Sequence, residues 1–264
     1  MKQNIEPTKQ IYFLSDLHLG ASCHKNSKAQ ERMIVSWLES ITDSAREIYL
    51  LGDVIDYWFE YRSVVPRGYV RFLGQLGRMV DSGIKITWIK GNHDLWITDY
   101  LPDELGVEVV DGILDRVIDG KRFVMEHGDG MGPQSPGFKL IRRVFRNKFA
   151  RWLFAGIHPR WTVGFAHGWS AKSRSGEGGL KLKEQLNKSV EILERSSIKY
   201  LEVNPGVDYF LYGHLHLVED RVLAGTNGTR MIVLGDWIDK FSYATYSPAE
   251  GMSMHQFCPG QNSC

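Results

Sequence analysis

Five short polar clusters, most of them directly after an apolar run, constrain this chain more than any other feature. The clusters are Asp16-Leu17-His18, Gly52-Asp53, Gly91-Asn92-His93-Asp94, His127-Gly128-Asp129 and Gly213-His214-Leu215-His216. The apolar runs, such as residues 11–14 and 48–51, have the length of buried strands. Open α/β sheets bind ligands where their strands end. The five clusters therefore predict one shared site at the ends of several strands.

Strand and helix patterns alternate through the first third of the chain, and this order predicts parallel strands covered by helices. The expected strands lie at 11–15, 48–51 and 84–89, and the expected helices at 29–41 and 69–80. Further on, Asp119-Gly120 between two apolar runs is typical of a type I′ hairpin. With the strand-rich residues 209–246, these patterns favour two mixed sheets packed face to face, with helices outside. The last residues, 248–264, show little periodicity and are expected to form a loosely ordered tail.

The pattern changes in the middle of the chain, where residues 131–205 are expected to form a helical insertion within a single domain at 1–247. Between 138 and 154, large apolar residues fall on one helical stripe and basic residues on the other face. Residues 138–188 hold 12 Lys or Arg against 2 acidic residues, although the whole chain has a net charge of only +1. The insertion is thus predicted to face an anionic partner. The alternative is that the apolar stripe is only the packing face between two helices.

The residue types within the clusters are those that bind metals. Residues two apart in an extended chain point the same way, so Asp16 and His18 could share one ion. A carboxylate after a strand, as at Asp53, could bridge two cations, although a lone Gly-Asp is more often a turn. Asn92 offers a neutral amide oxygen, and His93 beside it could donate a proton to a phosphate or leaving group. The alternative at this cluster is a turn in which the acidic residue caps the following segment.

Oxygen ligands mixed with imidazoles suit Mn²⁺, Fe²⁺ or Zn²⁺ better than Ca²⁺. Two such ions can clamp a phosphate between them and lower the pKa of a bound water. The sequence therefore predicts hydrolysis of a phosphate ester or anhydride by in-line attack, without a covalent enzyme intermediate.

The cysteines and the hydropathy point to a cytoplasmic location. Three widely separated cysteines argue against a disulfide framework. No stretch reaches the roughly 18 apolar residues that span a bilayer, and the first ten residues lack the apolar core of a signal peptide. The near-zero net charge gives no general reason to expect nucleic acid. Nothing in the sequence indicates the oligomeric state.

Taken in order, the clusters resemble the motif series of the calcineurin-like metallophosphoesterases, over residues 11–246. The resemblance implies a four-layer αββα sandwich, an α/β fold, with a dinuclear metal site. Matched motif by motif, it implies one metal held by Asp16, His18, Asp53 and His216, and a second held by Asp53, Asn92, His127 and His214. It also implies that His93 is the acid that contacts the phosphate and that Asp53 bridges the two ions.

The basic, aromatic insertion and the sequence Ser15-Asp16-Leu17-His18-Leu19 further resemble the UDP-2,3-diacylglucosamine diphosphatases of lipid A synthesis. In that group such an insertion forms a lid over the acyl chains. The resemblance implies cleavage of this nucleotide-linked lipid to UMP and 2,3-diacylglucosamine 1-phosphate, Mn²⁺ as the metal, and peripheral contact with the inner membrane. The substrate contacts expected on this basis are Asp94, Lys139, Arg142, Arg143, Lys172 and Arg174.

One position departs from that group. Its better-known members carry Arg where this chain has His93, and His93 instead matches the broader phosphoesterase pattern. A phosphodiesterase or pyrophosphatase acting on another nucleotide-linked or lipid phosphate is therefore the alternative. A scaffold without enzymatic activity is disfavoured, because every expected type of metal ligand is present.

Overall fold

The computed structural model describes residues 9–24, 26–131, 143–157 and 180–259. In this part of the chain the strands form two mixed sheets. The first has the order β11 (Gly251–Gln256), β10 (Ser242–Ser247), β1 (Gln10–Leu14), β2 (Ala45–Leu51), β3 (Lys85–Ile89) and β4 (Glu108–Val110). The second has the order β5 (Leu114–Ile118), β6 (Lys121–Glu126), β7 (Tyr209–Tyr212), β9 (Arg230–Leu234) and β8 (Val218–Val222). In the first sheet β1, β2, β3 and β4 are parallel, and the antiparallel strands β10 and β11 lie at one margin. In the second sheet β6, β7 and β9 are parallel, with antiparallel β5 and β8 at the two margins.

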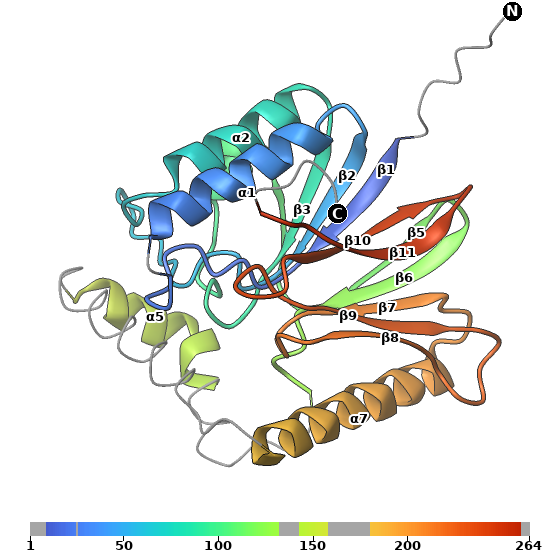
Figure 1. Cartoon of the computed structure of the whole chain (residues 1–264). Helices are drawn as coiled ribbons and strands as arrows, with labels where there is room; N and C mark the ends of the chain where they lie inside the picture. Colours follow the sequence, from blue (N-terminus) through green and yellow to red (C-terminus); the bar gives the residue numbers. More distant parts are fainter. Residues whose placement is uncertain (1–8, 25, 132–142, 158–179, 260–264) are drawn as a thin grey trace, which may run out of the picture.

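The layers follow the predicted four-layer order (Figure 1). Helices α1 (Ser27–Ile41) and α2 (Val70–Asp81), with the short α3 (Tyr100–Leu105), cover the outer face of the first sheet. Helix α7 (Leu180–Val203) covers the outer face of the second sheet. The chain thus has the αββα arrangement that the resemblance implied.

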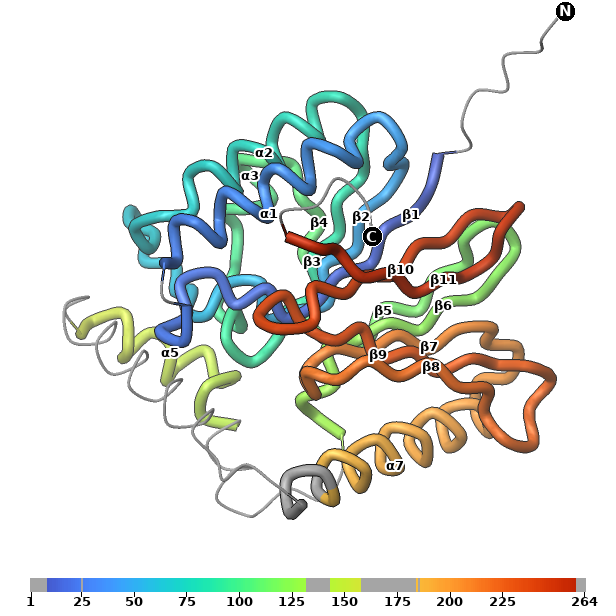
Figure 2. Tube along the Cα trace, viewed as in Figure 1, coloured from blue at the N-terminus to red at the C-terminus, as the bar shows by residue number. Residues whose placement is uncertain are grey.

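Strand β1 shows why both faces of the sheets are apolar. Ile11 and Phe13 point into the core between the two sheets, whereas Tyr12 and Leu14 point into the core beneath the helices. Successive side chains of a strand alternate between faces, so a strand with both faces covered needs a continuous apolar run. The last strands of the chain return to this first one, because β10 pairs antiparallel to β1 (Figure 2).

The hairpin at Asp119-Gly120 is confirmed. Both residues have positive φ, 50° and 78°, as a type I′ turn requires, and they join β5 to β6.

Two expectations about local structure were wrong. The helical stripe predicted over 138–154 is interrupted at Asn147, and a new helix, α5 (Lys148–Ala155), begins there. The Asn147 side chain caps this helix by accepting hydrogen bonds from the backbone N–H groups of Phe149 and Ala150. Asn favours the N-cap over a helix interior, which explains the break. The expected loose tail contains β11, which pairs with β10 over six residues. In β11 apolar and polar residues alternate over only a few positions, with Met252 and Met254 against the core between the sheets. This pattern is too short to predict a strand from the sequence.

Two further findings qualify the sequence analysis. Helix α7 lies inside the range expected to be insertion, but Val190 and Leu193 are buried against the second sheet, so α7 is the fourth layer of the sandwich. Cys258, just after β11, is disulfide-bonded. A disulfide at this cysteine was not expected from the sequence. None of the described helices has the length and apolarity needed to cross a membrane.

Candidate metal centre

The five clusters come together at one edge of the sandwich. Each follows the end of a parallel strand by one to three residues: Asp16 after β1, Asp53 after β2, Asn92 after β3, His127 after β6 and His214 after β7. The two sheets contribute to the same site because these strands all end there. The predicted convergence of the clusters is therefore what the structure shows.

An unusual backbone conformation recurs at these positions. The structure gives positive φ to Asp16, His18, Asp53, His214 and His216, with values from 44° to 67°. This left-handed region costs an ordinary L-residue roughly 1–2 kcal/mol. The turns after the strands thus hold their polar side chains in strained positions, which is common at functional sites.

Neighbouring glycines make room for the carboxylates. A Cβ atom on Gly91 would lie 2.2 Å from Asp53 Oδ1, and one on Gly213 would lie 1.9 Å from Ser15 Oγ and 2.6 Å from Asp16 Oδ2. Real Cβ atoms do not approach other atoms so closely. The glycines in the third and fifth clusters are therefore required by close packing around the site.

Asp16, His18 and His216 form the first possible metal-binding set. Asp16 Oδ1 lies 3.7 Å from His18 Nε2 and 3.5 Å from His216 Nε2, and the two imidazole nitrogens are 3.3 Å apart. Asp16 Oδ1 is buried and has no hydrogen-bond partner among the described residues. A buried carboxylate oxygen without a partner is costly, whereas a cation among these three atoms satisfies it.

Asp53, His127 and His214 form the second set, and their ligand atoms lie within 4.8 Å of one another. His127 Nε2 is 3.1 Å from Asp53 Oδ2 and 3.3 Å from Asn92 Oδ1. Asp53 Oδ2 is also 3.8 Å from His18 Nε2 of the first set. The same carboxylate oxygen thus lies between the two sets. This donor chemistry and spacing fit a dinuclear metal site.

Groups behind these side chains orient the imidazoles. His127 Nδ1 donates to the Leu51 carbonyl oxygen at 2.8 Å. His18 Nδ1 lies 3.1 Å from Asp56 Oδ1, and His216 Nδ1 lies 3.3 Å from Asp236 Oδ2. Partners of this kind fix the ring and leave the other nitrogen free for a metal.

Asp56 and Asp236 were not among the residues predicted from the sequence. A signal was available for Asp236, because Gly235-Asp236 directly follows the apolar strand β9, just as Gly52-Asp53 follows β2.

The electrostatics of the centre favour positive charge. Burial raises the pKa of Asp53, but the charges of His127 and His93 outweigh it and hold that pKa well below its usual value. Burial lowers the pKa of His18, but interactions with Asp16 and Asp56 raise it to about 10. Burial, and then the charge of His127, lower the pKa of His214 to about 4. The carboxylates therefore attract protons onto some imidazoles, and the same field attracts metal cations.

His93 lies beside the two sets, and its side chain is 14% exposed. Its Nδ1 donates to the carbonyl oxygen of Asp56 at 2.9 Å, and its Nε2 lies 3.9 Å from Asp53 Oδ2. Its backbone N–H donates to Asp53 Oδ1 at 2.8 Å. The ring is thus fixed through Nδ1, and Nε2 faces the centre.

The expected substrate contact at Asp94 is not supported. The Asp94 side chain is 0% exposed. Its Oδ1 accepts from Gly91 N at 2.7 Å, and its Oδ2 accepts from Val54 N at 2.9 Å and from Trp88 Nε1 at 3.0 Å. Asp94 therefore joins the turns after β2 and β3, and no surface of it is open to a substrate.

The described part of the insertion, residues 143–157, docks beside this centre. Trp96, three residues after His93, donates from Nε1 to the Phe145 carbonyl oxygen at 2.8 Å. Its ring also contacts Phe59, Phe145 and Phe154, with centroids 4.9 to 5.2 Å apart. The opposite face of the insertion is open: Phe149 and Trp152 stack on each other and are 65% and 69% exposed.

The basic side chains expected to meet substrate are only partly placed. Arg143 is described and exposed. Lys139, Arg142, Lys172 and Arg174 lie outside the described residues.

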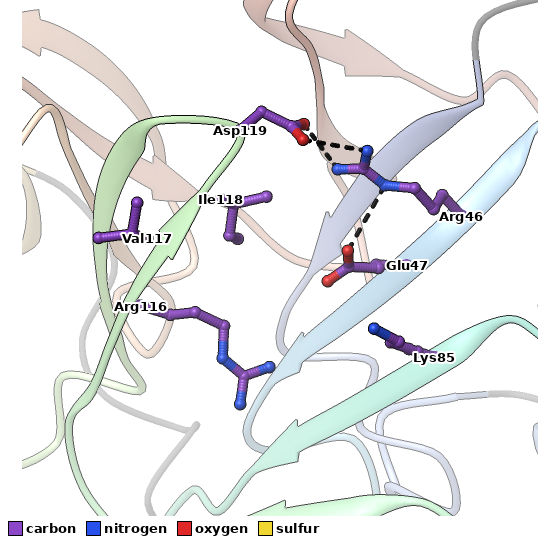
Figure 3. A pocket seen from close by; sticks show the side chains of 7 residues that line it. All are labelled: Arg46, Glu47, Lys85, Arg116, Val117, Ile118 and Asp119. Atoms are coloured by element: carbon purple, nitrogen blue, oxygen red, sulfur yellow. Dashed lines mark hydrogen bonds and ion pairs between the residues drawn. The ribbon is translucent and has the colours of Figure 1, made fainter.

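A separate cavity of about 490 Å³ lies at the opposite ends of β2 and β3, lined by Arg46, Glu47, Lys85, Arg116, Val117, Ile118 and Asp119 (Figure 3). Arg46 pairs with Asp119 at 2.7 Å and with Glu47 at 3.4 Å, and Arg116 pairs with Glu108 outside the lining at 2.7 Å. We assign no ligand to this cavity.

Comparison with known proteins gives consistent matches. Residues 9–218 match the family model described as calcineurin-like phosphoesterase. A UDP-2,3-diacylglucosamine hydrolase of Porphyromonas gingivalis is 42% identical over 247 residues, which cover 90% of this chain and 94% of that protein. A protein of the same name from Shewanella sp. strain MR-4 is 25% identical, over 92% of this chain and 95% of its own length. Among solved structures, an archaeal phosphodiesterase aligns with a TM-score of 0.47 and 11% identity, over 94% of this chain and 99% of that chain.

Proposed function

The chain belongs to the calcineurin-like phosphoesterase family, and on this basis we propose that it is a metal-dependent hydrolase of UDP-2,3-diacylglucosamine. The reaction cleaves the pyrophosphate bond and yields UMP and 2,3-diacylglucosamine 1-phosphate. The observation that carries the proposal is the 42% identity, across almost the full length of both chains, to the Porphyromonas gingivalis hydrolase of that name. The family model matches residues 9–218, which include both the metal centre and the expected insertion.

We propose the following roles for the residues of the centre. Asp16, His18 and His216 would hold one ion, and His127, His214 and Asn92 would hold the other. Asp53, whose Oδ2 lies near His18 and His127, would be shared by both ions. Mn²⁺ is the proposed metal, because a mixture of carboxylate, amide and imidazole ligands suits it. When bound, the two ions supply Lewis acidity to the phosphate and lower the pKa of a coordinated water.

His93 has a different proposed role, as the group that protonates the leaving oxygen. Nδ1 is committed to the Asp56 carbonyl, so the proton to be transferred is carried on Nε2, which faces the centre. The carboxylate of Asp56 also lies close to this ring, with Oδ1 3.5 Å from Nδ1. A positioned acid of this kind contributes about 10²–10⁴-fold to the rate.

The insertion is proposed to bind the acyl chains and the lipid phosphate. Phe149, Trp152 and Leu153 are exposed on α5, next to the basic residues Lys148 and Arg151. An exposed apolar face with basic neighbours suits an amphipathic anion better than a polar sugar nucleotide. The same face supports a proposed peripheral contact with an anionic membrane surface, from which such a substrate is taken.

The decisive experiment for the reaction is incubation of the purified protein and Mn²⁺ with UDP-2,3-diacylglucosamine, with UMP followed by phosphorus NMR. We expect stoichiometric UMP that disappears on chelation and returns when Mn²⁺ is restored. Hydrolysis of bis(p-nitrophenyl) phosphate without any UMP from the lipid would leave the family intact and remove the proposed substrate.

A second candidate function is hydrolysis of another nucleotide-linked or lipid phosphate, favoured by one observation. His93 occupies a position where the better-known diphosphatases of this kind carry Arg, and its geometry suits general acid catalysis of ester cleavage as well as anhydride cleavage. Parallel assays with UDP-N-acetylglucosamine and CDP-diacylglycerol separate the two candidates. Faster turnover of either compound than of UDP-2,3-diacylglucosamine would favour the second function.

The membrane contact is tested separately, by flotation with phosphatidylglycerol vesicles at low and high salt. We expect the wild-type protein to float at low salt and the double variant Phe149→Ser, Trp152→Ser to remain in the bottom fraction. Equal flotation of both proteins would place the contact elsewhere.

A further inference from the structure

The turn after β9 carries a buried carboxylate, Asp236, that lies beside the first metal-binding set. Asp236 is 3% exposed and follows Gly235, whose φ is 79°. The arrangement repeats that of Gly52 and Asp53 after β2, where Gly52 has a φ of 82°. A Cβ atom on Gly235 would lie 2.1 Å from Ser242 Oγ, so the chain there is tightly confined. The second sheet thus delivers a carboxylate to the centre in the same way as the first.

The two oxygens of Asp236 have separate partners. Oδ1 accepts hydrogen bonds from the backbone N–H groups of Ile238, Asp239 and Lys240, at 2.8 to 3.0 Å. Oδ2 lies 3.3 Å from His216 Nδ1. An ionised carboxylate only accepts, so His216 is the donor and carries its proton on Nδ1. Its Nε2 then presents a lone pair toward Asp16 Oδ1, 3.5 Å away.

His216 has a particular need for this partner. Its side chain is 32% exposed, whereas that of His18 in the same set is 1% exposed. Packing therefore surrounds the ring of His18, whereas the ring of His216 stacks on His18 and is partly open to solvent. The turn is also tied to the other ligand of the set, since the backbone N–H of Trp237 donates to the Asp16 carbonyl oxygen at 3.1 Å. The same turn thus contacts the ring of His216 and the backbone of Asp16.

We propose that Asp236 is a positioning residue that selects the Nδ1–H tautomer of His216 and aims its Nε2 at the first metal position. The proposal rests on the metal site of the proposed function, although not on its substrate. Both roles require two acceptor oxygens on one side chain: one accepts from the backbone N–H groups of the turn, and the other accepts from His216 Nδ1. Asn at this position keeps the turn through its oxygen but places an NH₂ group against Nδ1, which then accepts, so that Nε2 carries the proton and cannot bind a metal.

The test is Mn²⁺ binding to metal-free protein, by calorimetry and by electron paramagnetic resonance, without any substrate. We expect Asp236→Asn to retain one tight site and to weaken the other about 10–100-fold, the usual effect of losing such a partner. Asp239→Asn is the matched control, because it removes the same charge from the same turn, where the side chain is exposed. Two sites of wild-type affinity in Asp236→Asn would overturn the proposal.

A second measurement does not depend on how well the variant folds. In wild-type protein loaded with diamagnetic Zn²⁺, long-range proton–nitrogen spectra report which ring nitrogen of His216 carries hydrogen, with the signal assigned through His216→Ala. A proton on Nδ1 supports the proposal, and a proton on Nε2 refutes it. Neither measurement requires cleavage of UDP-2,3-diacylglucosamine, so its outcome is independent of the proposed substrate.

Discussion

Replacing His93 by Ala separates a catalytic role from a structural one. Within the described part of the chain the side chain makes one hydrogen bond, from Nδ1 to the Asp56 carbonyl oxygen at 2.9 Å. Losing one such bond costs roughly 1 kcal/mol, which corresponds to a fall in Tm of about 2–4 °C for a chain of this size. The rate is expected to fall about 10²–10⁴-fold, equivalent to about 2.7–5.4 kcal/mol of transition-state stabilisation. The loss in rate thus far exceeds what the loss in stability can explain.

The assay compares two leaving groups. If His93 protonates the leaving oxygen, the variant loses most activity on phosphodiesters of poorly acidic alcohols and least on bis(p-nitrophenyl) phosphate, whose leaving group needs no proton. Metal content is measured on the same samples and is expected to stay at two ions per chain. His255→Ala is a suitable control, because His255 lies on β11 and also makes one side-chain hydrogen bond, at 2.8 Å to Thr245. The reasoning is refuted by equal losses on both substrates, or by a loss below tenfold with full metal content.

Three further predictions follow from the same geometry. Asp53→Asn keeps the oxygen that accepts from His93 N but removes the negative charge between the two metal-binding sets. Calorimetry should therefore show that neither metal ion binds tightly. Binding of either ion at wild-type affinity contradicts the proposal that Asp53 bridges the two ions. Trp96→Phe removes the hydrogen bond to Phe145, which is worth about 1 kcal/mol. KM for the acylated substrate should therefore rise roughly fivefold, while turnover of bis(p-nitrophenyl) phosphate stays unchanged. Equal effects on both substrates would place Trp96 in the catalytic machinery. Burial lowers the pKa of His18, but its carboxylate neighbours raise it to about 10, and only the neutral ring binds metal. Mn²⁺ affinity should therefore rise with pH until about pH 10, with proton release visible as a buffer-dependent binding enthalpy. An affinity independent of pH contradicts this.

The sequence was most informative where one local signal carried both structure and chemistry. Asp16 and Asp53 follow apolar runs by a fixed short distance, so strand ends and candidate ligands could be read together. The covering helices α1 and α2 were predicted for the same reason, since their apolar spacing is local. Signals that depend on a partner elsewhere in the chain were missed. Strand β11 is recognisable only once β10 is beside it, and Asp94 looks like a substrate contact until Trp88 and Val54 are placed around it.

The metal ligands of the centre were predicted from the sequence, whereas the groups that orient them were not. A metal ligand must be of a particular residue type, so Asp, Asn and His at strand ends are visible in the sequence. A group that orients a ligand needs only an acceptor oxygen in the right place, and the protein uses a carbonyl for His127, an aspartate in the next turn for His18, and an aspartate from another strand for His216. No sequence spacing connects Asp236 to His216, because β8 and β9 lie between them along the chain. The orienting groups are therefore a property of the folded topology, and their loss should alter the affinity of one metal site before it alters the fold.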